Sequence, residues 1–461
     1  MYEGDTIAAI STAPGEAGIG IVRMSGSEAF EIAQKIFRSS SGKPFSELRN
    51  REIHHGFIID PKTNQKMDEV LVSKMKAPHT YTTEDIVEVN CHGGIIAVKR
   101  ILELLLRNRA RLAQPGEFTK RAFLNGRIDL SQAEAVIDLI SAKTDKGMDV
   151  ALEQLEGSLS QRIQEIREII INMLAHMEAS IDYPEYDIEE VTYDTLLKDA
   201  KKVKKKIQKL LETSDTGKIL KEGLNTVIIG KPNVGKSSLL NALVKEGRAI
   251  VTDVPGTTRD IIEEYINIRG IPLKIIDTAG IRETRDVIEK IGVDKSKEFM
   301  EKADLILFLL DVSKELSKED ELLIDLVQNK RAIILFNKID LDPKVSIENL
   351  KNRFQGKSII EISVLKGKGL ERLENEIVEM VYGGQVSIGD TGLVTNVRHK
   401  NLLENALNSI TATIGTIENN LSLEFISVDL KDCWDYLGQV TGDTVSEDII
   451  DQIFSNFCIG K

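Results

Sequence analysis

The sequence predicts a protein of several domains in the class α/β plus α, in which a second α/β domain is inserted into a helical domain. Three observations lead to this prediction. The chain has 461 residues, more than one hydrophobic core normally organises. Its N-terminal part has strand-like patterns, and the parts that follow alternate between purely helical and mixed patterns. We therefore expect domains at 1–118, 119–219, 220–384 and 385–461, of which the second and fourth form one split helical domain.

The N-terminal part has the mixed pattern of an α/β domain. Helical patterns occur at Ser27–Phe37 and Ile95–Arg107. The strand-like runs, each bounded by turn residues, are Asp5–Ser11, Gly20–Met24, His55–Ile59, Glu69–Met75 and Asp85–Asn90.

The next part is helical. Apolar residues recur every three or four positions from Leu152 to Ile181, which predicts one face of a long helix that ends before Pro184. A second helical run extends to Leu211, and the chain is helical again from Asn396.

Short apolar runs between these helical parts predict central strands of a largely parallel sheet, buried on both faces. They are Thr226–Gly230, Ile275–Asp277, Asp304–Asp311, Ala332–Asn337 and Ser358–Ser363.

Composition narrows the functional classes. The net charge of −13 argues against a general nucleic-acid binder, so any RNA contact needs a local basic patch. The three cysteines, Cys91, Cys433 and Cys458, are too few and scattered for a disulfide framework or a zinc cluster. The sequence has neither a signal-peptide pattern nor an apolar stretch long enough to cross a bilayer. We expect a cytoplasmic protein without a membrane contact.

The strongest functional signal is the glycine-rich segment Gly230–Ser237, which fits the P-loop pattern G-x-x-x-x-G-K-[ST]. It follows an apolar strand and precedes a helical run, so a chance glycine turn is the weaker interpretation. Backbone N–H groups and the helix N-terminus favour phosphate there. Lys236 is expected to reach the β- and γ-phosphates, and Ser237 to bind Mg²⁺. The expected nucleotide contacts in this loop are Asn233, Val234, Gly235, Lys236, Ser237 and Ser238.

Three further segments follow in the order typical of a GTPase. Asp340 of the segment Asn337-Lys338-Ile339-Asp340 can accept both guanine N–H donors, and a neighbouring loop at Ser363–Leu365 is a weaker match for the guanine side. Thr258 is a candidate second Mg²⁺ ligand and catalytic residue. The two other segments, also expected to contact GTP, are Thr252-Asp253-Val254-Pro255-Gly256-Thr257-Thr258 and Asp277-Thr278-Ala279-Gly280.

Together these segments predict a Ras-like P-loop GTPase domain. The residue after Gly280 is Ile281, where many small GTPases carry a glutamine that orients water. An apolar side chain cannot do this, so another group has to.

With these motifs, further segments make the chain resemble the MnmE (TrmE) family of tRNA uridine 5-carboxymethylaminomethyl modification GTPases. The resemblance extends over the whole chain. The segments that carry it, beside the GTPase motifs, are Asp5–Ala9, Gly18–Arg23, Tyr81–Asp85, His92–Gly94, Pro115–Phe118, Arg121–Asn125 and Cys458–Lys461.

The resemblance implies a potassium-activated GTPase whose G domains dimerise across their nucleotide faces. Asn233, Thr252, Val254 and Thr257 would hold K⁺ where other GTPases place an arginine finger. Glu289 would be the catalytic residue that positions water, whereas the residues alone favour a solvated charge on a helix face there.

The resemblance also implies an N-terminal domain that binds 5-formyltetrahydrofolate, or a related formyl- or methylene-tetrahydrofolate, and forms a homodimer. Arg23, Glu84, Arg127 and Lys461 match the folate-contacting positions, with Arg127 where the family often has lysine. By residue chemistry alone, Arg23 and Glu84 are equally well ordinary structural charges.

The expected reaction adds an aminomethyl or carboxymethylaminomethyl group to C5 of the wobble uridine of certain tRNAs. The resemblance implies a partner that carries FAD, a protein of the MnmG (GidA) family, in a heterotetramer. A regulatory or ribosome-assembly GTPase that binds RNA without modifying it is the alternative, and a signalling scaffold with a degenerate nucleotide site is disfavoured by intact Lys236, Ser237 and Asp340.

Two features remain open at this stage. Cys458 invites a role as nucleophile beside Lys461, although it lies near a chain end, where chains are often mobile. The basic run Lys201–Lys206 has the composition of an RNA-phosphate contact, but the apolar residues within it favour a solvated helix face.

Overall fold

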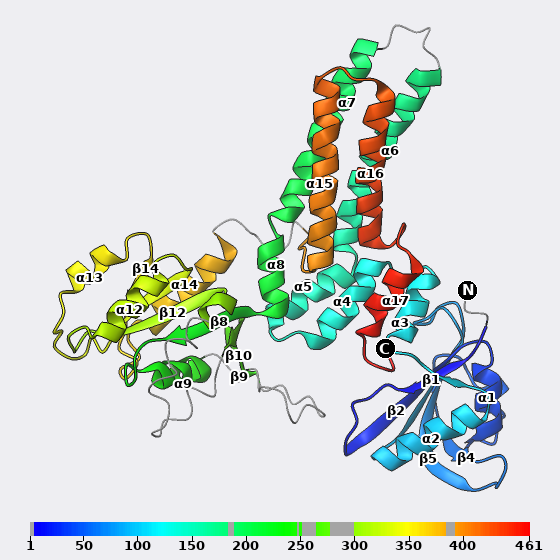
Figure 1. Cartoon of the computed structure of the whole chain (residues 1–461). Coiled ribbons are helices and arrows are strands. Elements are labelled where there is room, and N and C mark those ends of the chain that lie inside the picture. Colours follow the sequence, from blue (N-terminus) through cyan, green and yellow to red (C-terminus); the bar gives the residue numbers. More distant parts are fainter. Residues whose placement is uncertain (1–3, 183–188, 247–248, 251–263, 277–298, 384–391) are drawn as a thin grey trace. The chain divides into compact units, whose positions relative to one another are not determined.

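The computed structural model describes residues 4–182, 189–246, 249–250, 264–276, 299–383 and 392–461. These fall into two compact units, the first made of residues 1–137 and 438–461 and the second of residues 138–437. Each unit contains a seven-stranded sheet (Figure 1). The fold class predicted above is confirmed, while the domain boundaries after residues 118, 219 and 384 remain predictions.

The sheet of the first unit has the order β3-β4-β5-β6-β2-β1-β7 and is antiparallel except for the β1–β7 pair. Helices α1 (Ala29–Ile36) and α2 (Ile95–Arg107) pack on one face, and their apolar sides form a core with that face. The strands are β1 (Ile7–Ile10), β2 (Ala17–Ser25), β3 (Phe37–Ser39), β4 (Ile53–Ile59), β5 (Lys66–Met75), β6 (Ile86–Gly93) and β7 (Arg111–Leu112), with a short 3₁₀ helix η1 (Phe45–Glu47) after β3.

The C-terminal residues complete the first unit. Helix α17 (Glu447–Ser455) packs against α3 (Glu117–Leu124) and the start of α4 (Leu130–Ser141), with Phe454 and Phe457 in a small core. An ion pair between Lys120 and Asp451 links α3 to α17. The two ends of the sequence therefore belong to the same unit.

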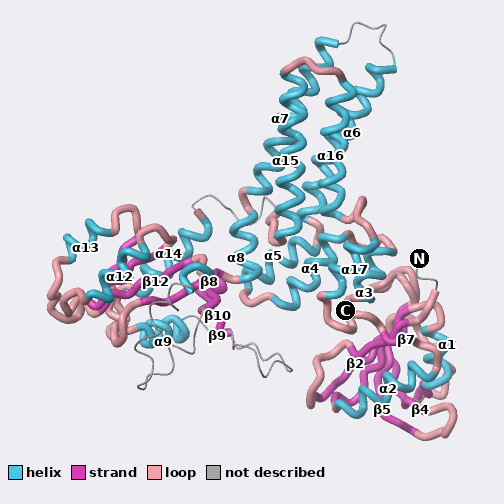
Figure 2. Tube along the Cα trace, viewed as in Figure 1, coloured by secondary structure: helices cyan, strands magenta, loops and turns pink. Residues whose placement is uncertain are grey.

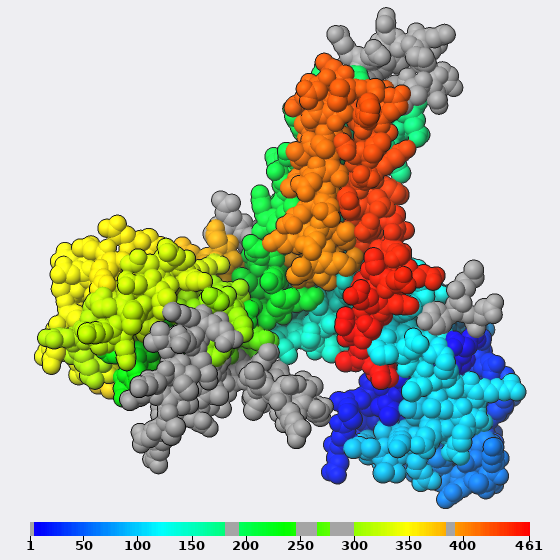
Figure 3. All heavy atoms as spheres, viewed as in Figure 1, coloured from blue at the N-terminus to red at the C-terminus, as the bar shows by residue number. Residues whose placement is uncertain are grey.

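A helical bundle makes up the first half of the second unit and its C-terminal return (Figure 2). Its helices are α5 (Asp145–Leu155), α6 (Ser158–Asp182), α7 (Glu189–Leu211), α8 (Ser214–Glu222), α15 (Val397–Glu418) and α16 (Leu423–Thr441). Helices α15 and α16 lie side by side, in orange and red in Figure 3.

The prediction of one continuous helix from Leu152 was wrong at its start. The chain breaks at Gly157, whose φ of 94° lies in the left-handed region that glycine tolerates. Leu152 on α5 is 42% exposed, whereas Ile163, Ile166 and Ile170 on α6 are buried. The buried residues of α5 are Val150, Ala151 and Gln154, so the period read from Leu152 does not mark the buried face of that helix.

The second unit's sheet has the order β14-β13-β12-β8-β11-β10-β9, parallel from β14 to β11. Apolar residues alternate between two cores, one on each face, which explains why the central strands read as unbroken apolar runs. The strands are β8 (Leu224–Ile229), β9 (Ala249–Ile250), β10 (Glu264–Ile268), β11 (Ile271–Ile275), β12 (Leu305–Asp311), β13 (Ala332–Asn337) and β14 (Ser358–Glu361), and the helices are α9 (Lys236–Glu246), α12 (Lys318–Val327), α13 (Ile347–Arg353) and α14 (Leu370–Tyr382).

One strand of this sheet differs from its prediction. The run expected at Ile275–Asp277 is the end of β11, which begins at Ile271 and pairs with β10 through a tight turn. Asp277 itself lies outside the described residues. Among the described residues, no helix is both long and apolar enough to cross a membrane.

Candidate functional site

The P-loop connects β8 to α9, as the sequence predicts. Gly235 (φ 109°) lies so close to Asn337 that a Cβ would come within 2.5 Å of its side-chain nitrogen. Asn233 also has a positive φ, 63°, which asparagine tolerates better than most residues. Val234 points into the core and is fully buried. The loop is therefore a tight cradle anchored on its inner side.

Lys236 occupies the mouth of this cradle. Its Nζ donates hydrogen bonds to the carbonyl oxygens of Gly230 (2.6 Å) and Lys231 (3.0 Å). Burial lowers the pKa of Lys236 because its positive charge is removed from water. A bound polyphosphate would place negative charge beside the Lys236 ammonium group and so stabilise its charged form. Ser237 and Ser238 follow in the first turn of α9, half-buried and exposed.

The Asn-Lys-x-Asp segment lies against the P-loop. Asn337 donates from Nδ2 to the carbonyl of Val234 (2.7 Å) and accepts at Oδ1 from the N–H of Val364 (3.2 Å). Lys338 donates to the carbonyl of Asn233 (3.0 Å) and to Asp311 (2.6 Å). These contacts hold the phosphate loop and the predicted guanine loop together.

Asp340 lies at the open end of this arrangement. Ser363 donates to its Oδ1 over 2.6 Å, and this hydrogen bond holds the pKa of Asp340 below its ordinary value. The carboxylate is thus ionised, and Ser363 orients it. Burial alone would raise the pKa of Asp311, but hydrogen bonds from Lys338 and Ser313 lower it, so Asp311 is also ionised.

A contact that sequence reasoning missed ties the P-loop to α12. Lys231 forms an ion pair of 2.5 Å with Asp320, which is 1% exposed. Asp320 also accepts from Ser317 in a capping box at the start of α12. The Ser317-Lys318-Glu319-Asp320 pattern indicates a helix start, but nothing in it points to a lysine 89 residues away.

Several predicted residues lie outside the described residues. These are Ile281, the proposed catalytic Glu289, and the two segments Thr252–Thr258 and Asp277–Gly280. No cluster of His, Cys, Asp and Glu able to hold a metal ion occurs in the part that the structure describes.

The predicted folate-contacting arginines converge on Tyr81 in the first unit. Arg127 donates to the carbonyl of Tyr81 (2.8 Å), and its guanidinium lies 4.8 Å from the centre of the Tyr81 ring. Arg23 lies 5.9 Å from the same ring and 5.7 Å from that of Phe118, and it pairs with Glu88 at 2.7 Å. Two cations around one aromatic ring form a site suited to a flat, anionic ligand.

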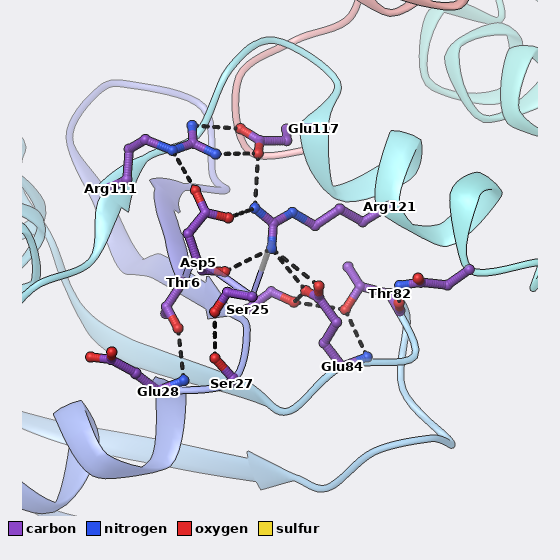
Figure 4. Close-up of polar contacts among 12 residues, drawn as sticks. Asp5, Thr6, Ser25, Ser27, Glu28, Thr82, Glu84, Arg111, Glu117 and Arg121 are labelled. Carbon is purple, nitrogen blue, oxygen red and sulfur yellow. Dashed lines mark hydrogen bonds and ion pairs between the residues drawn. The ribbon is translucent and has the colours of Figure 1, made fainter. Parts of the chain in front are cut away.

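Glu84 lies beside this site in a network of charges (Figure 4). It accepts from Ser25 (2.7 Å) and from Arg121 (3.1 Å). Arg121, 4% exposed, also donates to Asp5 and to the buried Glu117. Burial would raise the pKa values of Asp5 and Glu117, but hydrogen bonds from Arg111 and Arg121 hold both below their ordinary values. Glu84 is therefore held in place by its neighbours.

The C-terminal tail is attached to the same unit. The carbonyl of Cys458 accepts from the N–H of Gly116 (3.3 Å), and that of Gly460 accepts from the Ser11 hydroxyl (3.2 Å). A Cβ on Gly460 would lie 2.3 Å from the carbonyl oxygen of Ile10. Gly460 thus lies against Ile10 of β1, and Ile10 pairs with Val22 of β2, the residue before Arg23. Lys461 is the residue that follows Gly460.

The three cysteines differ in their surroundings. Cys91 and Cys433 are buried, and desolvation raises the pKa of their thiols to about 11 and about 12. They are core residues. Cys458 is exposed.

A glycine loop between a strand and a helix, joined to an Asn-Lys-x-Asp segment by direct hydrogen bonds, defines a P-loop GTPase. Two family models match the chain: the N-terminus of the GTP-binding protein TrmE over residues 6–127, and the MnmE helical domain over residues 130–458. The chain belongs to the MnmE family of tRNA-modification GTPases, and it is a GTP-hydrolysing enzyme.

Its relatives match over their whole length. Proteins named tRNA modification GTPase MnmE are 62% identical in Alkaliphilus oremlandii and 60% in Alkaliphilus metalliredigens, over 100% of both chains. The protein of that name in Bacillus subtilis is 53% identical over 99% of this chain and 100% of its own. The solved G domain of the FeoB iron transporter of T. maritima matches 34% of this chain and 97% of that chain at 26% identity, with a TM-score of 0.25.

Proposed function

We propose that this chain is a potassium-activated GTPase that drives modification of C5 of the wobble uridine in certain tRNAs. It acts in the cytoplasm as a homodimer, together with an FAD-carrying protein of the MnmG family. The product carries an aminomethyl or carboxymethylaminomethyl group. The observation that carries the proposal is that one chain combines a P-loop joined to an Asn-Lys-x-Asp segment with an aromatic ring flanked by two arginines, in the unit to which the C-terminal tail is attached.

In the nucleotide site, each residue has a separate task. Lys236 neutralises phosphate charge, and Asp340 selects guanine by accepting its N–H donors. Mg²⁺, with Ser237 and Thr258 as proposed ligands, supplies positive charge at the phosphates when bound. Glu289 positions the attacking water, the task that Ile281 cannot perform.

Asn233 is the proposed centre of the potassium site, with Thr252, Val254 and Thr257. Its backbone carbonyl is used by Lys338, while its exposed side-chain amide makes no hydrogen bond within the described residues. The amide oxygen is therefore free to bind a cation. A cation there supplies the charge that an arginine finger supplies elsewhere.

In the first unit, we propose that Arg23, Arg127 and Lys461 bind the anionic part of a formyl-tetrahydrofolate. Tyr81 offers its ring to the flat pterin, and Glu84 accepts N–H donors from it. The buried Arg121 keeps Glu84 in place.

The test has two parts. Nucleoside mass spectrometry of tRNA from cells that lack this chain should show wobble uridines without the C5 group, restored by the unaltered gene. Unchanged wobble uridines would defeat the proposal and favour a GTPase that binds RNA without modifying it. In vitro, GTP turnover should rise sharply when Na⁺ is replaced by K⁺, and Asn233→Ala should reduce that rise; equal rates in both salts argue against a potassium site.

A further inference from the structure

Helix α7 has four exposed lysines along one side. Lys198, Lys202, Lys205 and Lys209 are all exposed, at spacings of four, three and four residues. Residues so spaced lie on one side of an α-helix. We call these four residues the α7 lysine row. It extends over about 16 Å at the usual rise per residue.

This row faces away from the bundle. The buried residues of α7 pack against α6 and α15, and they lie about half a turn from the lysines on the helix. They are Leu196, Ala200, Val203, Ile207 and Leu210. The lysine row is therefore on the outer face of α7, where no other described helix of the bundle packs.

Two of the three other lysines in the run Lys201–Lys206 have acidic partners, and the third, Lys204, is half-buried. Lys201 pairs with Glu418 on α15 at 3.0 Å, and Lys206 pairs with Glu165 on α6 at 2.8 Å. Within the described part of the chain, none of the four lysines in the row forms an ion pair or a side-chain hydrogen bond. The structure thus divides the basic run into lysines that join helices and lysines that do not.

One acid, Asp199, lies within the span of the row, but it is rotated by about 100° from Lys198 around the helix. Two others lie at the ends of the row: Asp194 is one turn before Lys198, and Glu212 follows Lys209. The four row positions themselves carry only positive charge, and like charges at i, i+4 destabilise a helix. Such a row in a chain of net charge −13 favours a polyanionic ligand over a random surface composition.

We propose that the α7 lysine row binds the phosphate backbone of the RNA on which this enzyme acts. This inference rests on the proposed function, in which tRNA is the substrate. The new element is the place of binding: RNA is held on the outer face of the bundle, by phosphate contacts that position it without reading its sequence. Four lysines on a straight helix suit a row of phosphates along one strand.

Salt dependence gives the sharpest test. Binding of unfractionated bacterial tRNA to the full chain is measured by filter binding in 50–200 mM KCl. Each phosphate neutralised contributes about 0.7–0.9 to the slope of log K against log salt. Changing all four lysines to alanine should lower the slope by about 3 and the affinity at 50 mM KCl by at least about tenfold. Alanine favours helix, so the variant should fold, which circular dichroism checks.

The matched control removes four exposed lysines that are scattered over the surface, so that net charge changes equally. Suitable changes are Lys43→Ala, Lys62→Ala, Lys99→Ala and Lys314→Ala. This control should keep most of the slope, and a fourfold Lys→Arg variant of the row should bind as tightly as the unaltered chain. An equal loss in the scattered control would overturn the proposal, because only net charge would then matter.

Two other outcomes would also overturn it. One is no measurable tRNA binding by the unaltered chain at 50 mM KCl. The other is equal, row-dependent binding of poly-glutamate, which would point to an acidic protein as the ligand. Potassium-stimulated GTP turnover, measured on the same variants, should not change. Failure of the lysine row therefore leaves the proposed function standing, and failure of the proposed function is detected separately by nucleoside analysis.

Discussion

At the scale of single residues, the proposed role of Asp340 is to select the base that the nucleotide site accepts. Asp340→Asn replaces an ionised acceptor with an amide that presents an N–H donor to the guanine amino group. Two charge-assisted hydrogen bonds are lost, so GTP affinity should fall by at least about 100-fold. Xanthosine triphosphate, which has an oxygen in place of the amino group, should bind the variant better than GTP does.

Competition with a fluorescent nucleotide measures both affinities. The exposed Asp342 is the matched control, and Asp342→Asn should bind GTP normally. If Asp340→Asn retains GTP selectivity, Asp340 does not contact the base.

Arg121 is the residue on which the charge network of the first unit depends. Arg121→Ala leaves Glu117, 2% exposed, and Asp5 with one cation fewer. Breaking a buried ion pair in this way costs about 3–5 kcal/mol. Lys35→Ala, which breaks an exposed pair with Glu31 in the same unit, should cost about 1 kcal/mol or less.

The same network predicts a pH dependence. The folded-state pKa values of Asp5 and Glu117 lie below their ordinary values. Their contribution to stability is therefore complete above the unfolded pKa values, about 4, and is lost as pH falls through the lower, folded-state values. Hydrogen exchange of the β1 and β2 amides, measured between pH 7 and pH 3, follows the stability of this unit. Arg121→Ala should flatten the acid-induced loss, and an unchanged profile would assign that loss to other carboxylates.

At the scale of elements, the sequence predicted those strands and helices that are long enough to show a local apolar pattern. The five strands expected in the first unit are present, and α2 has the predicted bounds. Strands β3 and β7 were missed because each is two or three residues long and depends on its neighbour for pairing. Hairpin β10–β11 was missed although apolar residues alternate on both sides of its turn, Arg269-Gly270. Pro272 stands within the second strand, and proline argues against a strand in a sequence.

The candidate sites also combine parts that are local in the sequence with contacts between distant residues. The P-loop and the Asn-Lys-x-Asp segment are local, so the sequence predicts both. The pairs Lys231–Asp320 and Arg121–Asp5 join residues far apart in the chain, and a single sequence does not tell which charges meet. Similarly, only Lys202 and Lys205 of the α7 lysine row fall within the run Lys201–Lys206, and the sequence alone does not tell which lysines of the helix have acidic partners.

The contact between the P-loop and α12 can be tested by a double-mutant cycle. Lys231→Met leaves Asp320 buried without its ammonium partner, whereas adding Asp320→Asn removes the unpaired charge. The single Lys231→Met change should therefore destabilise the β8–β12 region more than the double change does, with a coupling of about 0.5–3 kcal/mol. Hydrogen exchange of β8 and β12 amides measures this, and Lys314→Met, at an exposed lysine, is the control. Additive effects would mean that the pair does not stabilise the loop.

At the scale of the whole molecule, the chain returns to its beginning: residues 438–461 belong to the unit that contains the N-terminal sheet. Gly460 makes the last contact of this return. Its φ is 92°, and a Cβ would overlap the carbonyl of Ile10 at 2.3 Å. Only glycine fits there without displacing the tail.

Gly460→Ala should therefore displace Lys461 from the folate site that we propose around Arg23. The nucleotide site, which lies in the other unit, should be unaffected. We expect binding of 5-formyltetrahydrofolate, followed by calorimetry, to weaken by about tenfold, the effect of losing one hydrogen bond to a charged group. GTP turnover should be unchanged. Ile459→Ala, at a side chain that is 54% exposed, is the control and should bind folate normally. If Gly460→Ala binds folate as tightly as the unaltered chain, the tail is only a structural closure of the first unit, and Lys461 has no part in the folate site.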